Sequence, residues 1–334
     1  MSAAAQPVST GSSDAMDGVS RAVRRNLWTI GLLIFLVALL VFTKLIQPNY
    51  GATGIQGLAV SAAALALAAV AQAIVVISGG IDLSIGAMMA FTNVVAAQAM
   101  RYTDDTTGIA VAIGVLLLGV LIGAINGALI VATRVADIIV TLAMSFVWAG
   151  CALLVLNVPG GQADKWLTSL ASGSVLTEWL PKPALIVLLI IAAIWFPLRR
   201  SRLGLSLYAI GSDRLAAFRS GVSVGRTKII SYALAGLFSA IAGLAITANT
   251  GIGTPLPGGY TLTSVAAVVL GGVSLAGGRG GVFGPLVAVV ILSLIRTDMT
   301  FLNLNSNLAT VTQGVILIAV VMLGSLAALR RNRA

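Results

Sequence analysis

Seven uncharged polar side chains interrupt the long apolar stretches of this sequence, and their amide and hydroxyl groups could hydrogen-bond a neutral, hydroxylated solute. Burying such groups against lipid is costly, so they are expected to face other helices or a cavity. We expect more than half of them to hydrogen-bond between helices and the remainder to line a path for the solute. These candidate path residues are Gln72, Asn93, Asn126, Thr141, Ser145, Thr247 and Asn249.

Groups that could perform catalysis are almost absent from the apolar stretches. No Asp, Glu, Lys or Arg lies near the centre of one, which argues against a proton-coupled carrier, because such carriers usually need a carboxylate inside the membrane. The chain has no His and a single Cys, Cys151, so His-based catalysis, Cys–His metal sites and an intrachain disulfide are excluded. We therefore expect no catalytic residue, no metal site and no enzymatic activity.

Two glycine-rich stretches resemble each other, VVISGGIDLSIG (75–86) and VVLGGVSLAGGRGG (268–281). Gly79 and Gly80 permit a tight turn or a close backbone approach. Asp82 is then placed to cap a following helix that begins at Leu83. We assign both stretches a structural role. In the second stretch, the residues expected to serve this role are Gly271, Gly272, Gly277 and Gly278. A further pattern of small residues, GxxxGxxxG from Gly119 to Gly127, predicts close packing of two helices.

The polar, basic stretch 199–226 contains a short predicted helix. Asp213 or Ser212 can cap its start, Leu215 and Phe218 share one face, and Gly221 can end it. One interpretation is that this helix docks into a groove on another protein. The other is that it is a solvated loop whose arginines only set the orientation in a membrane.

Composition indicates the solvent in which these elements lie. Of the 334 residues, 58% are hydrophobic and 9% charged, and the mean hydropathy is +1.05. A soluble domain carries about 25% charged residues, so two soluble domains are excluded. The net charge of +10 could suggest nucleic acid, but the basic residues lie between apolar runs, and no nucleic-acid partner is expected.

Ten apolar runs predict an all-α polytopic membrane protein of about ten transmembrane helices. With the N-terminus in the cytoplasm, 15 of the 20 Lys and Arg residues fall on the cytoplasmic side, and so does the C-terminus. We expect a disordered tail over 1–26, a transmembrane domain over 27–329 that includes the loop 199–226, and a basic tail over 330–334. The runs are 27–46, 56–77, 83–100, 108–132, 137–157, 183–198, 227–249, 261–276, 281–297 and 307–328.

From about residue 27 onward the chain resembles bacterial ABC transporter permeases of the ribose-type monosaccharide family. The resemblance is carried by GGIDLSIG (79–86), by the stretch 203–244 and by GYTLTSVAAVVLGGVSLAGGRGG (259–281). It implies a second permease copy, a cytoplasmic ABC ATPase that binds ATP and Mg²⁺, and a periplasmic or lipid-anchored substrate-binding protein. It also implies that the predicted short helix couples to the ATPase through Asp213, Arg214, Leu215, Ala217, Phe218, Arg219, Ser220 and Gly221.

The leading hypothesis is a permease of the bacterial inner membrane that imports a pentose or hexose by alternating access. The same machinery could carry another polar solute, such as a branched-chain amino acid, a nucleoside or a sugar-derived signal, and a stand-alone secondary carrier is a third reading. The chain itself is expected to hold no cofactor. Its faint echo of a phosphate loop, 221–227, is one residue short and lacks the lysine, so ATP hydrolysis belongs to a separate subunit.

Overall fold

The computed structural model describes residues 12–256 and 258–304, together with Leu308, Val311, Thr312, Gly314, Val315, Ile318 and Met322. Its elements in chain order are α1 Ser12–Ile46, α2 Ala52–Ile77, α3 Ile85–Ala99, α4 Asp105–Thr133, α5 Asp137–Val155, α6 Lys165–Leu170, β1 Ser174–Val175, β2 Thr177–Pro181, α7 Lys182–Arg200, α8 Arg202–Ser212, α9 Arg214–Arg219, α10 Val224–Thr250, α11 Tyr260–Leu270 and α12 Phe283–Phe301.

Apolar helices of membrane-spanning length make up most of the fold. Seven are long and apolar enough to cross a bilayer, namely α2, α4, α5, α7, α10, α12 and the part of α1 from Trp28. Two shorter apolar helices, α3 and α11, correspond to two further predicted runs. The prediction of a polytopic α-helical membrane protein is confirmed. The tenth run, 307–328, and the basic tail 330–334 lie largely or wholly outside the described residues.

The first helix is longer than its apolar run. The structure describes residues 12–26 as helix, where the sequence analysis predicts a disordered tail, and residues 1–11 lie outside the described part of the chain. This segment contains one Gly and no Pro, so nothing in its sequence forces the helix to stop before the span begins.

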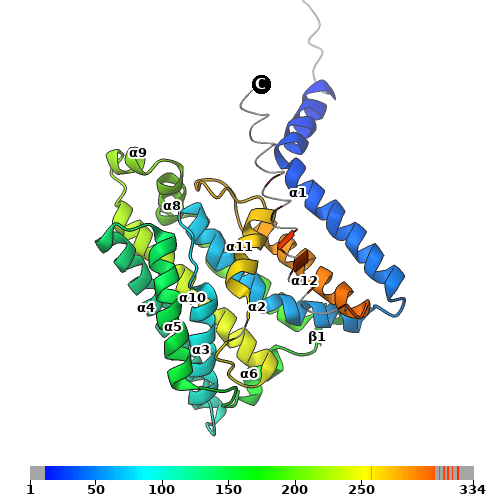
Figure 1. Ribbon diagram of the computed structural model, residues 1–334. Helices are drawn as coiled ribbons and strands as arrows, with labels where there is room; N and C mark the ends of the chain where they lie inside the picture. The colour runs from blue at the N-terminus through cyan, green and yellow to red at the C-terminus, as the bar shows by residue number, and fades with distance from the viewer. Residues whose placement is uncertain are drawn as a thin grey trace, which may run out of the picture.

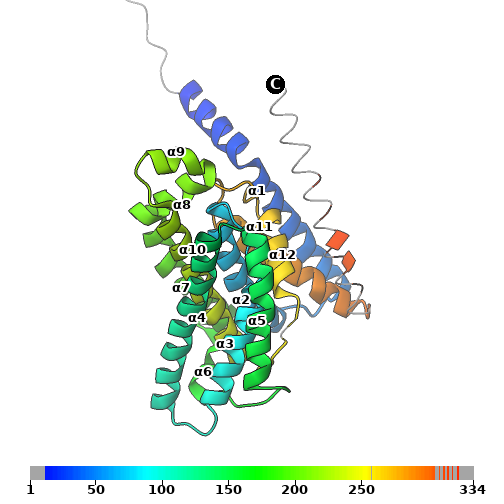
Figure 2. The ribbon, with the colours of Figure 1, turned by 60° about the vertical axis from the view of Figure 1, so that its left-hand side comes forward.

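Helix α2 lies at the centre of the bundle, in contact with α10, α12, α11 and α7 (Figure 1). Helix α10 packs against α4 on its other side, and α1 packs against α12 (Figure 2). The contact between α4 and α10 uses the glycine pattern in α4, because a Cβ on Gly123 would lie 2.9 Å from the Cα of Gly236. The prediction that these glycines serve close helix packing is confirmed.

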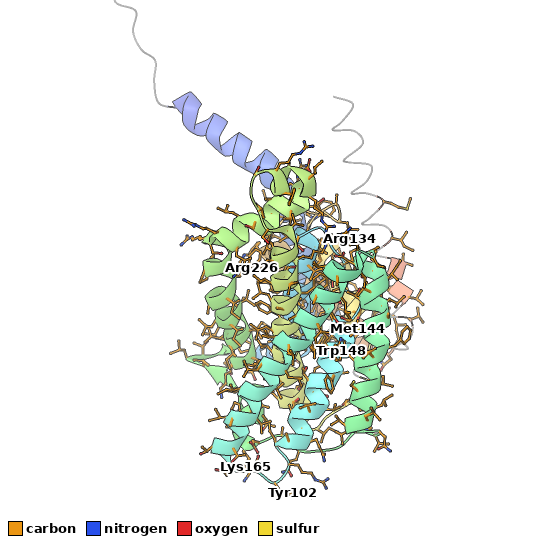
Figure 3. The ribbon with its side chains drawn as sticks, turned by 90° about the vertical axis from the view of Figure 1, so that its left-hand side faces the viewer. Tyr102, Arg134, Met144, Trp148, Lys165 and Arg226 are labelled. Carbon is orange, nitrogen blue, oxygen red and sulfur yellow. The ribbon has the colours of Figure 1, made fainter. Side chains whose placement is uncertain are left out.

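The loops separate into two ends of the bundle. Helices α8 and α9 lie near Arg134 and Arg226 at one end, which we call the α9 end, whereas Tyr102 and Lys165 lie at the opposite end (Figure 3). The opposite end also carries the short helix α6. Between α6 and α7, β1 and β2 form an antiparallel two-stranded ribbon, and Trp179 lies in β2.

Candidate functional site: a cavity beside two short helices

A cavity of about 400 Å³ lies between α3, α5 and the segment that leads into α11. Among its lining residues no side chain is charged, and the hydroxyl groups come from Ser145 and Thr261. Phe146 and Leu256 border it and are 73% and 66% exposed, so the cavity lies at the surface of the chain. The lining residues are Leu83, Gly86, Ala87, Ala90, Ser145, Phe146, Ala149, Pro255, Leu256, Gly258 and Thr261.

The cavity lies where two short helices begin. Helix α3 runs from this point toward the opposite end, and α11 runs toward the α9 end (Figure 1). The amide of Gly86 donates to Thr261 Oγ1 at 3.0 Å and so joins the two helix starts. Gly86 is required there, because a Cβ would lie 2.6 Å from the same oxygen. Helices α3 and α11, with 15 and 11 residues, are short for a span, and both begin within the bundle beside a cavity.

The backbone amides at the start of α3 already have partners. Leu83 donates to Thr141 Oγ1 at 3.0 Å, and Ser84 donates to Asp82 Oδ1 at 2.7 Å. The prediction that Asp82 caps a helix beginning at Leu83 is wrong, because α3 begins at Ile85 and its N-cap is Ser84, which has no side-chain cap hydrogen bond. The reason is that Asp82 binds the amide two residues ahead of it, which holds residues 82–84 in a turn outside the helix.

Five of the seven candidate path residues are buried and bonded to other parts of the chain. Asn93 joins Thr247, with 2.7 Å between Nδ2 and Oγ1, and accepts from the amide of Thr254 at 2.6 Å. Asn126 donates to Ser84 Oγ at 2.8 Å and accepts from Trp148 Nε1 at 3.1 Å. These groups hold helices together, as expected for more than half of the set.

The other two of these five contact the segment that precedes α3. Thr141 accepts from the amide of Leu83 and donates to the carbonyl of Asp137 at 2.8 Å. Gln72 lies against the backbone of Asp82, and its amide nitrogen is 2.9 Å from the Asp82 carbonyl in the orientation that satisfies both groups. Both side chains therefore fix the segment in place rather than face a solute.

Ser145 and Asn249, the remaining two, line cavities. Ser145 lies in the cavity beside α3. Asn249 is exposed and lines a separate cavity of about 550 Å³ between α2, α6 and α10. This second cavity shares no lining residue with the cavity beside α3. Gly86, Phe146 and Thr261 are not among the predicted site residues. Gly86 and Thr261 lie inside two of the motifs that carry the family resemblance, 79–86 and 259–281, whereas Phe146 lies in an apolar run without such a signal.

The two glycine-rich stretches meet in space. Gly79 and Gly277 have φ values of +77° and +85°, a region that glycine adopts without strain. A Cβ on Gly277 would lie 2.9 Å from the Cα of Gly79, and the amide of Gly278 donates to the carbonyl of Ile77 at 2.9 Å. Gly211, near the end of α8, packs against both loops. We call Gly79, Gly211, Gly277 and Gly278 the glycine junction.

Three further glycines of these stretches, Gly80, Gly271 and Gly272, also leave no room for a side chain. Gly80 leaves no room for a Cβ beside Asp137 and Tyr232. Gly271 packs against the backbone of Gly284, and Gly272, with φ +79°, packs against Trp28. These contacts are structural, in line with the role assigned from the sequence.

Helix α9 follows the glycine junction directly. Its start is capped by Asp213, whose Oδ1 accepts from the amides of Leu215 and Ala216 at 2.9 Å each, which confirms the predicted cap. Gly221 has φ +84°, and Ser220 and Gly221 lie where the helix ends. Leu215 and Phe218 are 57% and 67% exposed, whereas Ala217 is buried. The exposed side chains Arg214 and Arg219 flank this apolar pair.

A groove of about 660 Å³ runs alongside α9 at this end. It lies between α9, the start of α10 and the turn from α4 to α5. Its lining residues are Ile130, Val131, Arg134, Val135, Ala136, Asp137, Arg214, Leu215, Phe218, Val224 and Gly225. Apolar and basic groups thus share one surface at the α9 end.

These features define a class, a multi-pass helical membrane protein with an uncharged cavity and an exposed helix at one end. The chain belongs to the permease family described as "Branched-chain amino acid transport system / permease component", whose family model matches residues 54–321. The resemblance to ABC transporter permeases of the ribose type is confirmed. The chain is a non-catalytic transport component and a multi-pass protein of the inner membrane.

Several curated proteins are similar over most of their length. The ribose import permease protein RbsC of Escherichia coli (strain K12) is 31% identical over 300 residues, which cover 87% of this chain and 91% of RbsC. RbsC of Bacillus subtilis (strain 168) is 32% identical, with 88% and 92% covered. The probable ABC transporter permease protein YphD of E. coli K12 is 32% identical, with 100% and 99% covered. No solved structure matches the chain.

Proposed function

We propose that this chain is the permease subunit of an ABC importer that moves a monosaccharide, a pentose or a hexose, into the cell by alternating access. The similarity to permeases named for ribose and for D-allose supports a sugar as the solute. The chemistry of the cavity beside α3 is the observation that carries the proposal.

That cavity suits a neutral solute with many hydroxyl groups. Ser145 and Thr261 offer hydroxyls, and the ring of Phe146 offers an apolar face on which the C–H side of a sugar ring can lie. A zwitterion would call for a charged partner or free amides at a helix start. The amides of Leu83, Ser84 and Gly86 are occupied, and the buried carboxylate of Asp82 already accepts from one of them.

A branched-chain amino acid is the second candidate, because the description of the family model names that transport system. Its side chain would fit the apolar lining, but no lining side chain is charged, so its ammonium and carboxylate groups would find no charged partner there. The electrostatics of the cavity therefore favour the sugar.

We further propose three partners. The exposed face of α9, with Leu215 and Phe218, and the basic groove beside it suit docking to a cytoplasmic ABC ATPase, which would bind ATP and Mg²⁺. A substrate-binding protein would deliver the solute at the opposite end. A second permease copy, identical or paralogous, would cover the open side of the cavity at Phe146 and Leu256.

The proposed topology follows from this arrangement. Ten spans would place both termini in the cytoplasm, with the transmembrane domain over 27–329, the coupling loop over 199–226 and cytoplasmic tails over 1–26 and 330–334. The position of Arg134 and Arg226 at the α9 end, opposite Lys165, supports this orientation (Figure 3).

The test is uptake by proteoliposomes that contain this permease, its cognate ATPase and its binding protein. We expect ATP-dependent uptake of labelled D-ribose or D-allose and none of L-leucine. Uptake of leucine without uptake of either sugar would show that the solute is a branched-chain amino acid, the second candidate. Uptake driven by an ion gradient in vesicles without the ATPase would overturn the proposal in favour of a secondary carrier.

A further inference from the structure

A buried ion pair joins α5 to α10 at the α9 end. Asp137, the first residue of α5, accepts from Lys228 Nζ at 2.6 Å and from the hydroxyl of Tyr232 at 2.7 Å. The Lys228 and Asp137 side chains are only 5% and 15% exposed, and Tyr232 is fully buried. Lys228 and Tyr232 lie one turn apart on α10, so both reach the same carboxylate.

Packing alone does not require this pair. An apolar pair of similar volume often stabilises a protein as well as or better than a buried ion pair, because taking two charges out of water is costly. The position of Asp137 at a helix start lowers part of that cost. What the pair adds is a directional link, since a displacement of Lys228 must move the carboxylate or break the pair.

The same carboxylate contacts the segment that leads into the cavity. Gly80 has no side chain, and a Cβ there would overlap Asp137 Oδ2 and lie 2.8 Å from the Tyr232 hydroxyl. One turn along α5, Thr141 bonds both the carbonyl of Asp137 and the amide of Leu83. Leu83 lines the cavity, so two contacts connect the start of α5 to a cavity wall.

Asp137 also faces the groove beside α9. It lines this groove together with Phe218 of α9 and Val224, the first residue of α10. Only four residues separate α9 from α10, and the amide of Val222 among them donates to the carbonyl of Ala217 at 3.0 Å. A partner that moves α9 therefore moves the start of α10, which carries Lys228 and Tyr232.

We propose that Asp137 is a positioning residue that transmits movement of α9 and α10, through Lys228 and Tyr232, to the segment 80–83 and hence to the cavity. The inference rests on the proposed function, since it requires an ATPase at α9. It assigns the coupling to a specific side-chain contact rather than to the bundle as a whole.

The experiment measures how the cavity responds to nucleotide. Cysteines replace Phe146 and Leu256 in a Cys151→Ala background, and spin labels on them report the width of the cavity by pulsed electron resonance. The labelled permease is reconstituted with its ATPase, and the distance is recorded with and without ATP and vanadate. ATP hydrolysis and co-purification of the ATPase are measured on the same samples.

We expect the unmodified pair to give a nucleotide-dependent distance change, and Lys228→Met to abolish it while the ATPase still co-purifies and hydrolyses ATP. Asp137→Asn should abolish the distance change as well. Transport per ATP should fall about tenfold or more, as expected for loss of a charge-assisted hydrogen bond. Tyr232→Phe should give a smaller loss. If a single variant fails to accumulate, the double variant Asp137→Asn with Lys228→Met leaves no unpaired charge and should show the same loss.

The matched control is Arg226→Met, which removes an exposed cation from the same helix and should leave the distance change intact. A full distance change in the Asp137 and Lys228 variants would overturn the inference. If the unmodified permease neither binds the ATPase nor responds to nucleotide, the proposed function fails instead, so the two failures are distinguishable.

Discussion

The most apolar 18-residue windows of α2 and α5 have the same mean hydropathy, 2.4, but these two helices have opposite surroundings. In their most apolar windows, 89% of the α2 residues are buried inside the chain, compared with 17% for α5. Both would be classed as spans of equal strength from sequence. The difference between them is which neighbour covers each apolar surface.

The reason lies in side-chain size. Helix α2 carries a dense run of alanines, so α10, α11 and α12 approach it closely on several sides. Helix α5 exposes large side chains, with Phe146 at 73% and Leu154 at 88%, and packs mainly on α3. Two helices of equal hydropathy can therefore have different surroundings. Helix α2 is enclosed by protein, whereas α5 faces lipid, the cavity and, by our proposal, a second copy.

The largest expected effect comes from adding bulk to α2. Ala69 is fully buried, so Ala69→Trp should destabilise the protein by about 3 kcal/mol through overpacking. The matched control is Gly150→Trp on α5, where a Cβ meets no atom within 4 Å. Thermal unfolding in detergent measures both, and equal losses of stability would contradict the difference in packing between α2 and α5.

A smaller loss is expected at the glycine junction, where α2 ends. A Cβ on Gly211 would overlap the carbonyl of Ile77 and lie 2.6 Å from the amide of Gly278, so Gly211→Ala should cost about 2 kcal/mol. Gly281→Ala, in open space on the neighbouring loop, is the control. An unchanged unfolding temperature for Gly211→Ala would contradict the close contact.

On the cavity side of α5, a substitution should lower transport and leave the stability of the protein unchanged. Ser145→Ala removes a hydroxyl that lines the cavity, so sugar uptake should fall about three- to tenfold, the worth of one hydrogen bond. Thermal unfolding should stay unchanged, since the Ser145 hydroxyl donates only to the carbonyl of Leu142 in its own helix. Uptake equal to that of the unmodified protein would remove Ser145 from the path.

The smallest effect is expected on the outer face of α5. Leu154 is 88% exposed, so Leu154→Ala should change stability by no more than about 0.5 kcal/mol in detergent. Size-exclusion chromatography of the same variant measures its oligomeric state. A shift toward monomer would assign this face to the second copy, whereas an unchanged profile would assign it to lipid.

The local elements were predictable because their signals lie close together in the chain. Hydropathy predicts the spans, and Asp213 predicts the start of α9 because a cap acts on amides two and three residues away. The site was less predictable. Among the seven candidate path residues, residue type could not separate Ser145, which lines the cavity beside α3, from Asn93 or Asn126, which bond other helices.

The sequence is sufficient to predict a multi-pass helical membrane protein, the positions of its apolar helices and the exposed helix at the α9 end. The contact of Gly86 with Thr261, 175 residues away, and the pairing of Asp137 with Lys228 beside Gly80 became visible only in the folded chain. The two kinds of feature differ in the sequence distance over which they form. Helix formation and capping depend on neighbours within a few residues, whereas cavities and buried ion pairs exist only once distant helices pack.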